Sequence, residues 1–525
     1  MKKDNLIILL VTIFTIIIAY GTSVASPPPV YGGTLVWGRS AKINTLDPAT
    51  GVSEESQTAI AAIYDTLVRY NHETGLLEPS LAISWQISKD GKTLVFKLRR
   101  GVRFHDGNEL NAHAVVFSFS RQMDTSHPFY PPNIGYAKYI FDMVDNVYEI
   151  SSSKVGIRLK SPYAPFIHSL TIPAASIVSP AAVKKWKNQY HINPIGTGPF
   201  RLEKWESGER VALVQNENFW GERPFLDRLV YKTIVNSKDR FMELSTGSIQ
   251  VMDGIGPEEF GSIKRNNELD YSTTSGLNVC FITMNTQKPP FDNQKVRQAV
   301  NYAVNKAKIV KLLYQGLAEA AINPFPPSIW GYNHDIKGYE YNPKKAKVLL
   351  REAGYPNGFE TTLFKLPVPR FYNQLPDQTA HLIQANLAAV GIKAKISTFK
   401  DWKTYRSMLQ KGKHQMAFYG WGAEYKDPDY FLYNLLDLDN AVIGKGYNFS
   451  FFKDPEFHDL IIKAQENPVQ SQREVLYKRA QAIVHEKAPW VPLVHSQQIL
   501  GFHKSVHGII LDPREYWGFQ KAWIK

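Results

Sequence analysis

Runs of β-forming residues dominate the first half of the chain from Thr34 onward. Two such runs fill 34–38 and 93–98, and both read as strands. Asp90-Gly91, just before the second run, is a hairpin turn signal. The stretch 111–123 reads as a helix with Asn111 as its N-cap. The pattern predicts a strand-rich first region.

The second half changes to a regular alternation of helices and strands. Apolar residues recur at helical spacing over 292–314, and Asn342-Pro343 opens a further helix that Gly354 ends. The alternation that follows argues for a mixed or parallel sheet covered by helices. Its predicted strands are 361–368, 392–399, 415–421 and 490–495, and its predicted helices are 377–390, 401–409, 454–465 and 472–485.

The N-terminus has the pattern of a secretory signal peptide. Two lysines precede an apolar run over 6–20, and the small residues 23–25 follow it. We expect cleavage after Ala25 and an exported mature protein. The alternative is an uncleaved anchor, for which the run is short against the roughly 20 residues of a membrane span. No cysteine lies near the cut, so we do not expect a lipoprotein.

Composition and charge narrow the class of protein. With 525 residues, 44% hydrophobic and 21% charged, the chain reads as two or three globular domains, which excludes disordered, coiled-coil and polytopic membrane proteins. The formal charge of +13 lies in short basic groups, so it indicates a solvated surface rather than a nucleic-acid site. Cys280 is the single cysteine, which excludes an intramolecular disulfide, and its apolar surroundings predict a buried small hydrophobe.

Motifs for catalysis or metal binding are missing from the sequence. It contains no H-E-x-x-H, G-x-S-x-G or C-x-x-C, and no Lys-Ser/Thr follows the glycines of 196–198 as a phosphate loop needs. We therefore interpret 196–198 as a tight turn. His105 and His113 fit a satisfied surface role better than metal ligation. The sequence thus predicts a protein that is not an enzyme and holds neither a metal nor a cofactor.

Two opposite charges follow predicted strands of the second half. Arg370 comes just after 361–368 and Glu424 just after 415–421, and ligands of open α/β sheets bind at the carboxyl ends of strands. A guanidinium suits a carboxylate and a carboxylate suits an ammonium, so together they favour a zwitterion such as a short peptide. Trp421 would form an apolar wall. The alternatives are that both charges are solvated loop residues or pair with each other.

Several motifs resemble one known family along essentially the whole mature chain. The sequence is similar to the extracytoplasmic solute-binding proteins, family 5, the peptide- and nickel-binding proteins of ABC transporters, and most strongly to members that bind dipeptides. The matching segments are AISWQISKDGKTLVFKLRRGVRFHDG (82–107), NPIGTGPF (193–200), KVRQA (295–299), PPSIWGYN (326–333), Gly420-Trp421 and Asp427-Pro428-Asp429.

The resemblance implies an α/β, two-lobe periplasmic-binding-protein type II fold that closes on a ligand between its lobes. Residues 26–280 and 495–525 would form lobe I, 281–494 would form lobe II, and 1–25 would be the signal peptide. The implied partners are a short peptide and an ABC permease in the inner membrane, with the protein itself a monomer. Alternative ligands within the same role are haem, an antimicrobial peptide, a nickel chelate or an opine.

The resemblance also suggests ligand-binding residues. The stretch 367–373 (PVPRFYN) matches the setting in which the family's arginine holds a peptide carboxylate, which falls on Arg370. Glu424 stands where the family has an aspartate that holds the peptide's amino group, and it is one methylene longer. Trp421 and Tyr425 complete the set. The family's disulfides cannot form with one cysteine.

Overall fold

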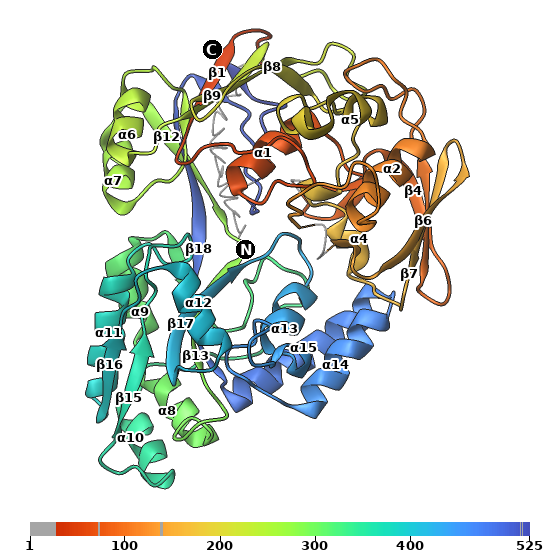
Figure 1. Ribbon diagram of the computed structural model, residues 1–525. Coiled ribbons are helices and arrows are strands. Elements are labelled where there is room, and N and C mark those ends of the chain that lie inside the picture. Colours follow the sequence, from red (N-terminus) through yellow and green to blue (C-terminus); the bar gives the residue numbers. More distant parts are fainter. Residues whose placement is uncertain (1–27, 72–73, 137–139, 515, 517) are drawn as a thin grey trace, which may run out of the picture.

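The structure is a computed structural model that describes residues 28–525, apart from 72–73, 137–139, 515 and 517 (Figure 1). The predicted signal peptide, 1–25, lies outside the described residues. Among the helices of the described part of the chain, none has both the length and the apolar character that crossing a membrane requires.

The largest sheet joins strands from distant parts of the sequence. Its order is β16-β15-β17-β13-β18-β11-β1-β10-β9-β8, and β12 and β14 also pair with β18. The strands are β1 (Thr34–Arg39), β8 (Phe200–Glu206), β9 (Arg210–Gln215), β10 (Arg228–Thr233), β11 (Val251–Met252), β12 (Leu269–Ser275), β13 (Asn278–Met284), β14 (Ala318–Ala320), β15 (Phe359–Phe364), β16 (Ile392–Ser397), β17 (Met416–Gly422) and β18 (Trp490–His503).

Strand β18 belongs to both ends of this sheet. Its first part pairs with β13, as in Thr283 with Trp490, and its second part pairs with β12, from Ser275 opposite Gln497 onward. We call the part built on β1 and β8–β12 the first lobe and the part built on β13–β17 the second lobe (Figure 1). The sequence predicted a strand ending at residue 495, which is too short. The polar residues after it interrupt the apolar run, but β12 supplies hydrogen-bonding partners for them.

The first lobe carries a separate antiparallel sheet of order β4-β5-β7-β6 and a small β2-β3 pair. The predicted hairpin is confirmed, since β4 and β5 pair on either side of Asp90-Gly91. So is the predicted N-cap, because the Asn111 side chain accepts from the Ala114 amide. The elements are β2 (Val68–Tyr70), β3 (Leu77–Pro79), β4 (Ala82–Ile87), β5 (Thr93–Leu98), β6 (Val144–Ser151), β7 (Lys154–Leu159), α1 (Glu54–Ile63), α2 (Ala112–Met123), α4 (Phe166–Ser169), α5 (Pro180–Trp186), α6 (Ser237–Ser245) and α7 (Pro257–Arg265), with the short helices η1 (Pro173–Ala175) and η2 (Lys187–Ile192).

The second lobe has the predicted mixed sheet. β15 is parallel to β16 and β17, whereas β13 is antiparallel to β17. Its helices are α8 (Gln294–Ala303), α9 (Lys306–Ile309), η3 (Val310–Tyr314), α10 (Pro343–Glu352), α11 (Pro376–Ala388), α12 (Trp402–Gln410), α13 (Asp429–Leu436), η4 (Leu438–Asn440), α14 (Pro455–Glu466) and α15 (Gln470–Lys487).

Two predicted elements of this lobe differ from the structure. The helical pattern over 292–314 is broken after α8, because Val304 is extended and Asn305 caps the next helix by accepting from the Lys308 amide. The predicted strand 361–368 ends at Phe364. Prolines at 367 and 369 lack an N–H for a strand ladder, so the chain leaves the sheet before Arg370.

Buried aromatic and aliphatic residues hold the sheet in place. The Phe281 and Trp490 rings stack at 3.6 Å between β13 and β18, and Cys280 beside them is fully buried, as predicted.

The glycine turn at 196–198 is confirmed as structural. The Gly198 amide donates to the Ile63 carbonyl at 2.9 Å, and a Cβ at Gly196 would lie 2.1 Å from that same oxygen.

The chain after β18 returns to the first lobe. Its last strands, β19 (Val506–His507) and β20 (Trp523–Ile524), pair with each other. Phe519 packs 4.9 Å from the ring of Trp37 on β1. This anchors the C-terminal segment, from which Pro513, Arg514 and Tyr516 line the cavity between the lobes.

Candidate ligand-binding site

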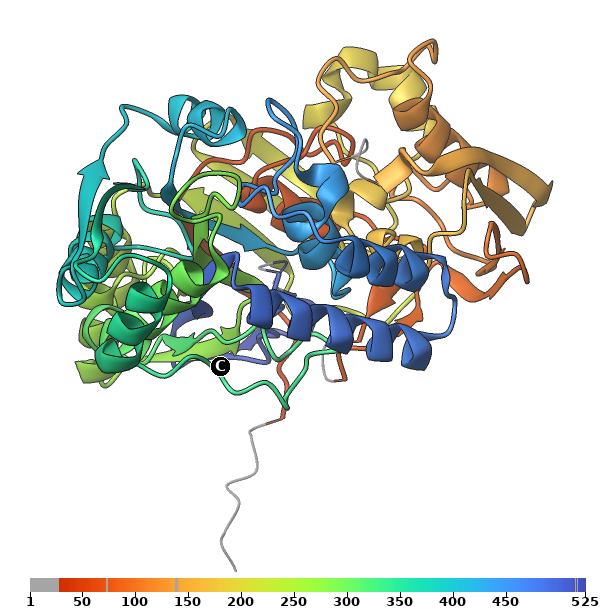
Figure 2. The ribbon, with the colours of Figure 1, turned by 90° about the horizontal axis from the view of Figure 1, so that it is seen from below.

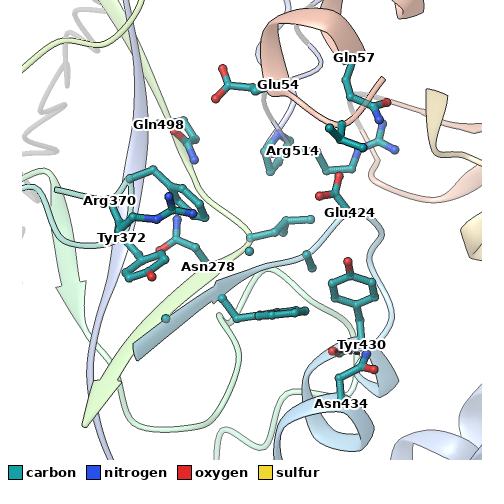
Figure 3. A pocket seen from close by; sticks show the side chains of 18 of the residues that line it. Glu54, Gln57, Asn278, Arg370, Tyr372, Glu424, Tyr430, Asn434, Gln498 and Arg514 are labelled. Carbon is teal, nitrogen blue, oxygen red and sulfur yellow. Dashed lines mark hydrogen bonds between the residues drawn. The ribbon is translucent and has the colours of Figure 1, made fainter. Parts of the chain in front are cut away.

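A cavity of about 480 Å³ lies where the two lobes face each other (Figure 3). The second lobe lines it with β17, α12 and the turn after β15. The first lobe contributes Glu54 and Gln57 of α1. Asn278 of β13, Gln498 of β18 and the C-terminal segment complete the wall.

Arg370 presents a guanidinium to this cavity from a tight turn. The Arg370 amide donates to the Asn373 carbonyl at 3.0 Å and the reverse bond measures 2.7 Å, which fixes the turn. The guanidinium carbon lies 4.6 Å from the ring centre of Trp402, a cation–π contact. Nε of Arg370 is buried without a hydrogen-bond partner among the described residues. The side chain is therefore placed to receive an anion.

Glu424 presents a carboxylate on the opposite side of the cavity (Figure 3). Its Oε1 accepts from the Tyr136 hydroxyl at 2.8 Å, and its Oε2 accepts from the Tyr516 hydroxyl. Burial raises the pKa of this carboxyl, while the two hydroxyls and the nearby Arg514 act in the opposite direction. A carboxylate offers about four acceptor positions, so two remain for a further donor.

Arg514 lies beside Glu424 but is neutralised by another acid. Its Nε donates to Oδ1 of Asp512 at 2.9 Å, and its guanidinium lies over the rings of Tyr70 and Tyr516. Glu54 on the cavity wall lies 3.4 Å from Arg39, which is also paired with the buried Asp253 at 2.9 Å. Of the acids that line the cavity, Glu424 is the one that forms no ion pair within the described residues.

Aromatic side chains form the floor between the two charges. The Trp421 ring centre lies 4.9 Å from that of Tyr447 and 6.1 Å from that of Tyr430. Trp402 is nearly parallel to Tyr419, at 5.9 Å. Flat, apolar surfaces of this kind suit side chains of varied shape, because they make few directional demands.

Three of the four residues suggested by the sequence line the cavity: Arg370, Trp421 and Glu424. No ion pair joins Arg370 to Glu424 within the part of the chain that the structure describes. Tyr425 does not line the cavity. Its ring is buried in the core of the first lobe and lies 4.7 Å from that of Tyr430.

Sequence reasoning missed the residues that come from other segments. Tyr136 and Tyr516 hold Glu424, and Arg406 of α12 also lines the cavity. None of these residues belongs to a sequence motif that contains Arg370 or Glu424.

The two lobes are joined beside the cavity by hydrogen bonds of Asn278. Its Oδ1 accepts from the Ser496 amide at 2.9 Å, and its Nδ2 donates to the Ser496 carbonyl at 3.0 Å. The His495 ring also bonds the Asn278 carbonyl, at 2.7 Å. These bonds fix β13 to the middle of β18, where that strand passes between the lobes.

Among the residues that the structure describes, one group outside the cavity has metal-ligand chemistry. Asp437, Asp439 and His458 bring their ligand atoms within 4.8 Å of one another. His458 Nδ1 lies 3.0 Å from Oδ1 of Asp437, so this contact is accounted for by a histidine–carboxylate pair.

Known proteins share both the sequence pattern and this architecture. Residues 77–441 match the model of the bacterial extracellular solute-binding proteins, family 5. The chain belongs to this family. Within the family it is 35% identical to the dipeptide-binding protein of Escherichia coli strain K12, over 94% of this chain and 95% of that protein. It is 37% identical to heme-binding protein A of Haemophilus influenzae, over 87% of this chain and 86% of that protein.

A solved structure of another such binding protein shows the same fold. The ABC transporter-associated periplasmic binding protein DppA of Helicobacter pylori, in complex with the peptide STSA, is 38% identical. It aligns over 94% of this chain and 98% of its own, with a TM-score of 0.77. This family 5 solute-binding protein therefore has the expected two-lobe, type II periplasmic-binding fold, with its cavity between the lobes.

Proposed function

We propose that the protein captures short peptides, dipeptides foremost, in the cavity between its lobes. Arg370 binds the peptide's carboxylate and Glu424 binds its ammonium. The observation that carries this proposal is the placement of these opposite charges on facing sides of one cavity, with no ion pair between them (Figure 3). The names of the relatives, which refer to dipeptides and to a bound peptide, support it.

The charges select for free termini. A closed cavity removes the peptide termini from water, and an unpaired buried charge costs several kcal/mol. A paired charge roughly breaks even, so Arg370 and Glu424 discriminate against blocked peptides more than they add affinity. The aromatic floor and trapped water then accommodate varied side chains.

The peptide-binding step would serve an ABC importer. We propose that the signal peptide, 1–25, directs the chain to the periplasm, where the protein works as a monomer and passes its ligand to an ABC permease. Residues 26–280 and 495–525 form one lobe and 281–494 the other. The first boundary falls within β13, and β18 changes its pairing partners between Ser496 and Gln497, two residues after the second boundary. Closure of the lobes around the ligand is the motion expected of such a clamp.

Haem is a second candidate, because a relative at 37% identity carries that name. Haem iron is commonly held by His, Cys, Met or Tyr. Of these residue types only tyrosine lines the cavity among the described residues, and Tyr136 and Tyr516 already donate to Glu424. Nickel would favour imidazole ligands in the same way. The lining therefore favours a peptide.

Calorimetry with Ala-Ala and its blocked forms tests the carboxylate end. We expect Arg370→Gln to weaken Ala-Ala binding by at least about 30-fold, the effect of removing one partner of a buried charge pair. C-amidated Ala-Ala should bind wild type and variant equally weakly. Lys403→Gln, an exposed cation on α12, is the matched control and should bind as wild type does. Unchanged affinity of Arg370→Gln for Ala-Ala would refute the assignment.

The ammonium end has its own test. N-acetyl-Ala-Ala should bind wild type much more weakly than Ala-Ala, and Glu424→Gln should remove that difference. Equal wild-type affinities for the two peptides would exclude Glu424 from the proposed role. Binding of haemin by the wild type in an absorbance titration, without binding of Ala-Ala, would favour the haem candidate instead.

A further inference from the structure

A second guanidinium, that of Arg406, faces the same cavity without an acidic partner. Its Nη2 donates to the Tyr447 hydroxyl at 2.7 Å, and its guanidinium carbon lies 4.9 Å from the centre of that ring. Nε of Arg406 is buried and has no hydrogen-bond partner in the described part of the chain. No salt bridge of Arg406 occurs among the described residues. One tyrosine hydroxyl, itself neutral, leaves the positive charge uncompensated.

Arg406 lies on the same side of the cavity as Arg370. Trp402 and Arg406 are one turn apart on α12 and share a helix face. The Arg370 guanidinium lies over the Trp402 ring, 4.6 Å from its centre. The two cations therefore flank one aromatic residue, while Glu424 lies across the cavity (Figure 3).

The charges of the cavity do not match a peptide with neutral side chains. Arg514 is paired with Asp512, and Glu54 shares Arg39 with Asp253, so Glu54 keeps part of its charge on the α1 wall. On the α12 side, by contrast, Arg370 and Arg406 form no salt bridge among the described residues. The termini of a neutral dipeptide supply one charge of each sign. One guanidinium would then be enclosed without a counterion when the lobes close, at a cost of several kcal/mol.

We propose that the site selects short peptides whose C-terminal residue carries an acidic side chain, with Arg406 as the specificity-determining residue. This rests on the proposed function, since Arg370 must hold the main-chain carboxylate. The side-chain carboxylate of the same residue reaches Arg406, because both cations lie on the α12 side. A C-terminal lysine is disfavoured by like-charge repulsion, which costs more in a low-dielectric cavity than in water.

The test compares matched dipeptides by calorimetry on the full mature protein. Ala-Glu should bind wild type at least tenfold more tightly than Ala-Gln, and Ala-Lys should bind most weakly. Glu-Ala, which carries its acid at the other end, should show no such gain over Gln-Ala. Arg406→Gln should reduce the ratio of Ala-Glu to Ala-Gln affinity to near one. Lys403→Gln, on the exposed face of α12, should keep the wild-type ratio.

Charge reversal provides a gain of binding that loss of folding cannot imitate. Arg406→Glu should bind Ala-Lys more tightly than Ala-Glu, the reverse of wild type. Equal wild-type affinities for Ala-Glu and Ala-Gln, or a ratio that survives Arg406→Gln, would overturn the inference and leave the peptide-binding proposal intact. A gain for Glu-Ala in place of Ala-Glu would overturn the assigned end. Failure of every dipeptide to bind wild type would overturn both proposals.

Discussion

The Glu424 carboxyl is subject to opposing effects on its ionisation. Burial raises its pKa, whereas the hydroxyls of Tyr516 and Tyr136 and the charge of Arg514 favour the ionised form. The pKa stays raised on balance. An ammonium bound at Glu424 would favour the carboxylate further, so peptide binding and ionisation of this group are coupled.

Peptide affinity should therefore depend on pH above the usual range of a glutamate, about 4.3. As the pH falls through the raised pKa, Glu424 takes up a proton and can no longer pair with an ammonium, so Ala-Ala binding should weaken. N-acetyl-Ala-Ala lacks the ammonium and should not show this component. Dissociation constants of Ala-Ala and N-acetyl-Ala-Ala, measured between pH 4 and 8, test this coupling. A ratio of the two constants that does not change with pH would contradict it.

The charged pair could be predicted from sequence because each residue follows a strand in a short local pattern. Arg370 follows β15 and Glu424 follows β17, and both line the cavity. Tyr136 and Tyr516 could not be predicted in the same way. They approach Glu424 from segments 288 and 92 residues away. The failed placement of Tyr425 has a related cause, since the chain after Glu424 turns into the core of the other lobe.

At the level of elements, β13 and β18 connect the lobes. Most helices and strands of the second lobe were predicted to within a few residues, because caps such as Asn342 and alternating apolar residues are local signals. The length of β18 was not predicted, because its second part is held by pairing with β12 rather than by an apolar pattern of its own. The break after α8 was also missed, because the apolar residues keep a helical spacing across it and hide the Asn305 cap.

Asn278 should contribute strongly to the connection between these strands. Asn278→Ala leaves the buried Ser496 amide without the acceptor it has now, while the Ser496 carbonyl keeps its hydrogen bond from the Gly276 amide. We expect a loss of about 1–3 kcal/mol in the free energy of unfolding, measured by urea denaturation. Gln498→Ala, two residues further along β18 and also on the cavity wall, should cost less. A smaller loss for Asn278→Ala than for Gln498→Ala would argue against this role.

In the whole molecule, the lobes also meet away from the cavity. Figure 2 shows α14 and α15 in dark blue, extending from the second lobe toward the orange strands of the first. The Ala164 amide donates to the Gln465 carbonyl at 2.6 Å. Asp429 accepts from the Tyr163 hydroxyl and from the Gln465 side chain, both at 2.9 Å. Burial, together with the charge of Asp427, raises the pKa of Asp429 to about 7.

This contact should make stability depend on pH. The folded protein keeps a proton on Asp429 up to about pH 7, whereas the unfolded chain releases it near 3.8. The stabilisation from Asp429 is therefore fully present below the lower value and is lost as the pH rises toward 7. The free energy of unfolding of the wild type, taken relative to that of Asp429→Asn, should fall by a few kcal/mol between pH 4 and 8.

Buried histidines make the free energy of unfolding change with pH in the opposite direction to Asp429. They are present in both the wild type and Asp429→Asn. Burial lowers the pKa of His414 to about 4, so its contribution to stability falls as the pH is lowered, and it cancels in the comparison. Urea denaturation of both proteins across this range measures the difference. A difference that stays constant with pH would show that Asp429 is ionised in the folded protein.

The position of β18 in the sheet has a consequence for biosynthesis. β13 lies between β17 and β18, and β11 lies between β18 and β1, so neither lobe has its full sheet before residue 503 is made. The cavity wall needs still later residues, Arg514 and Tyr516. A nascent chain on the ribosome thus has no finished site, and prematurely terminated products should be inert rather than partly active.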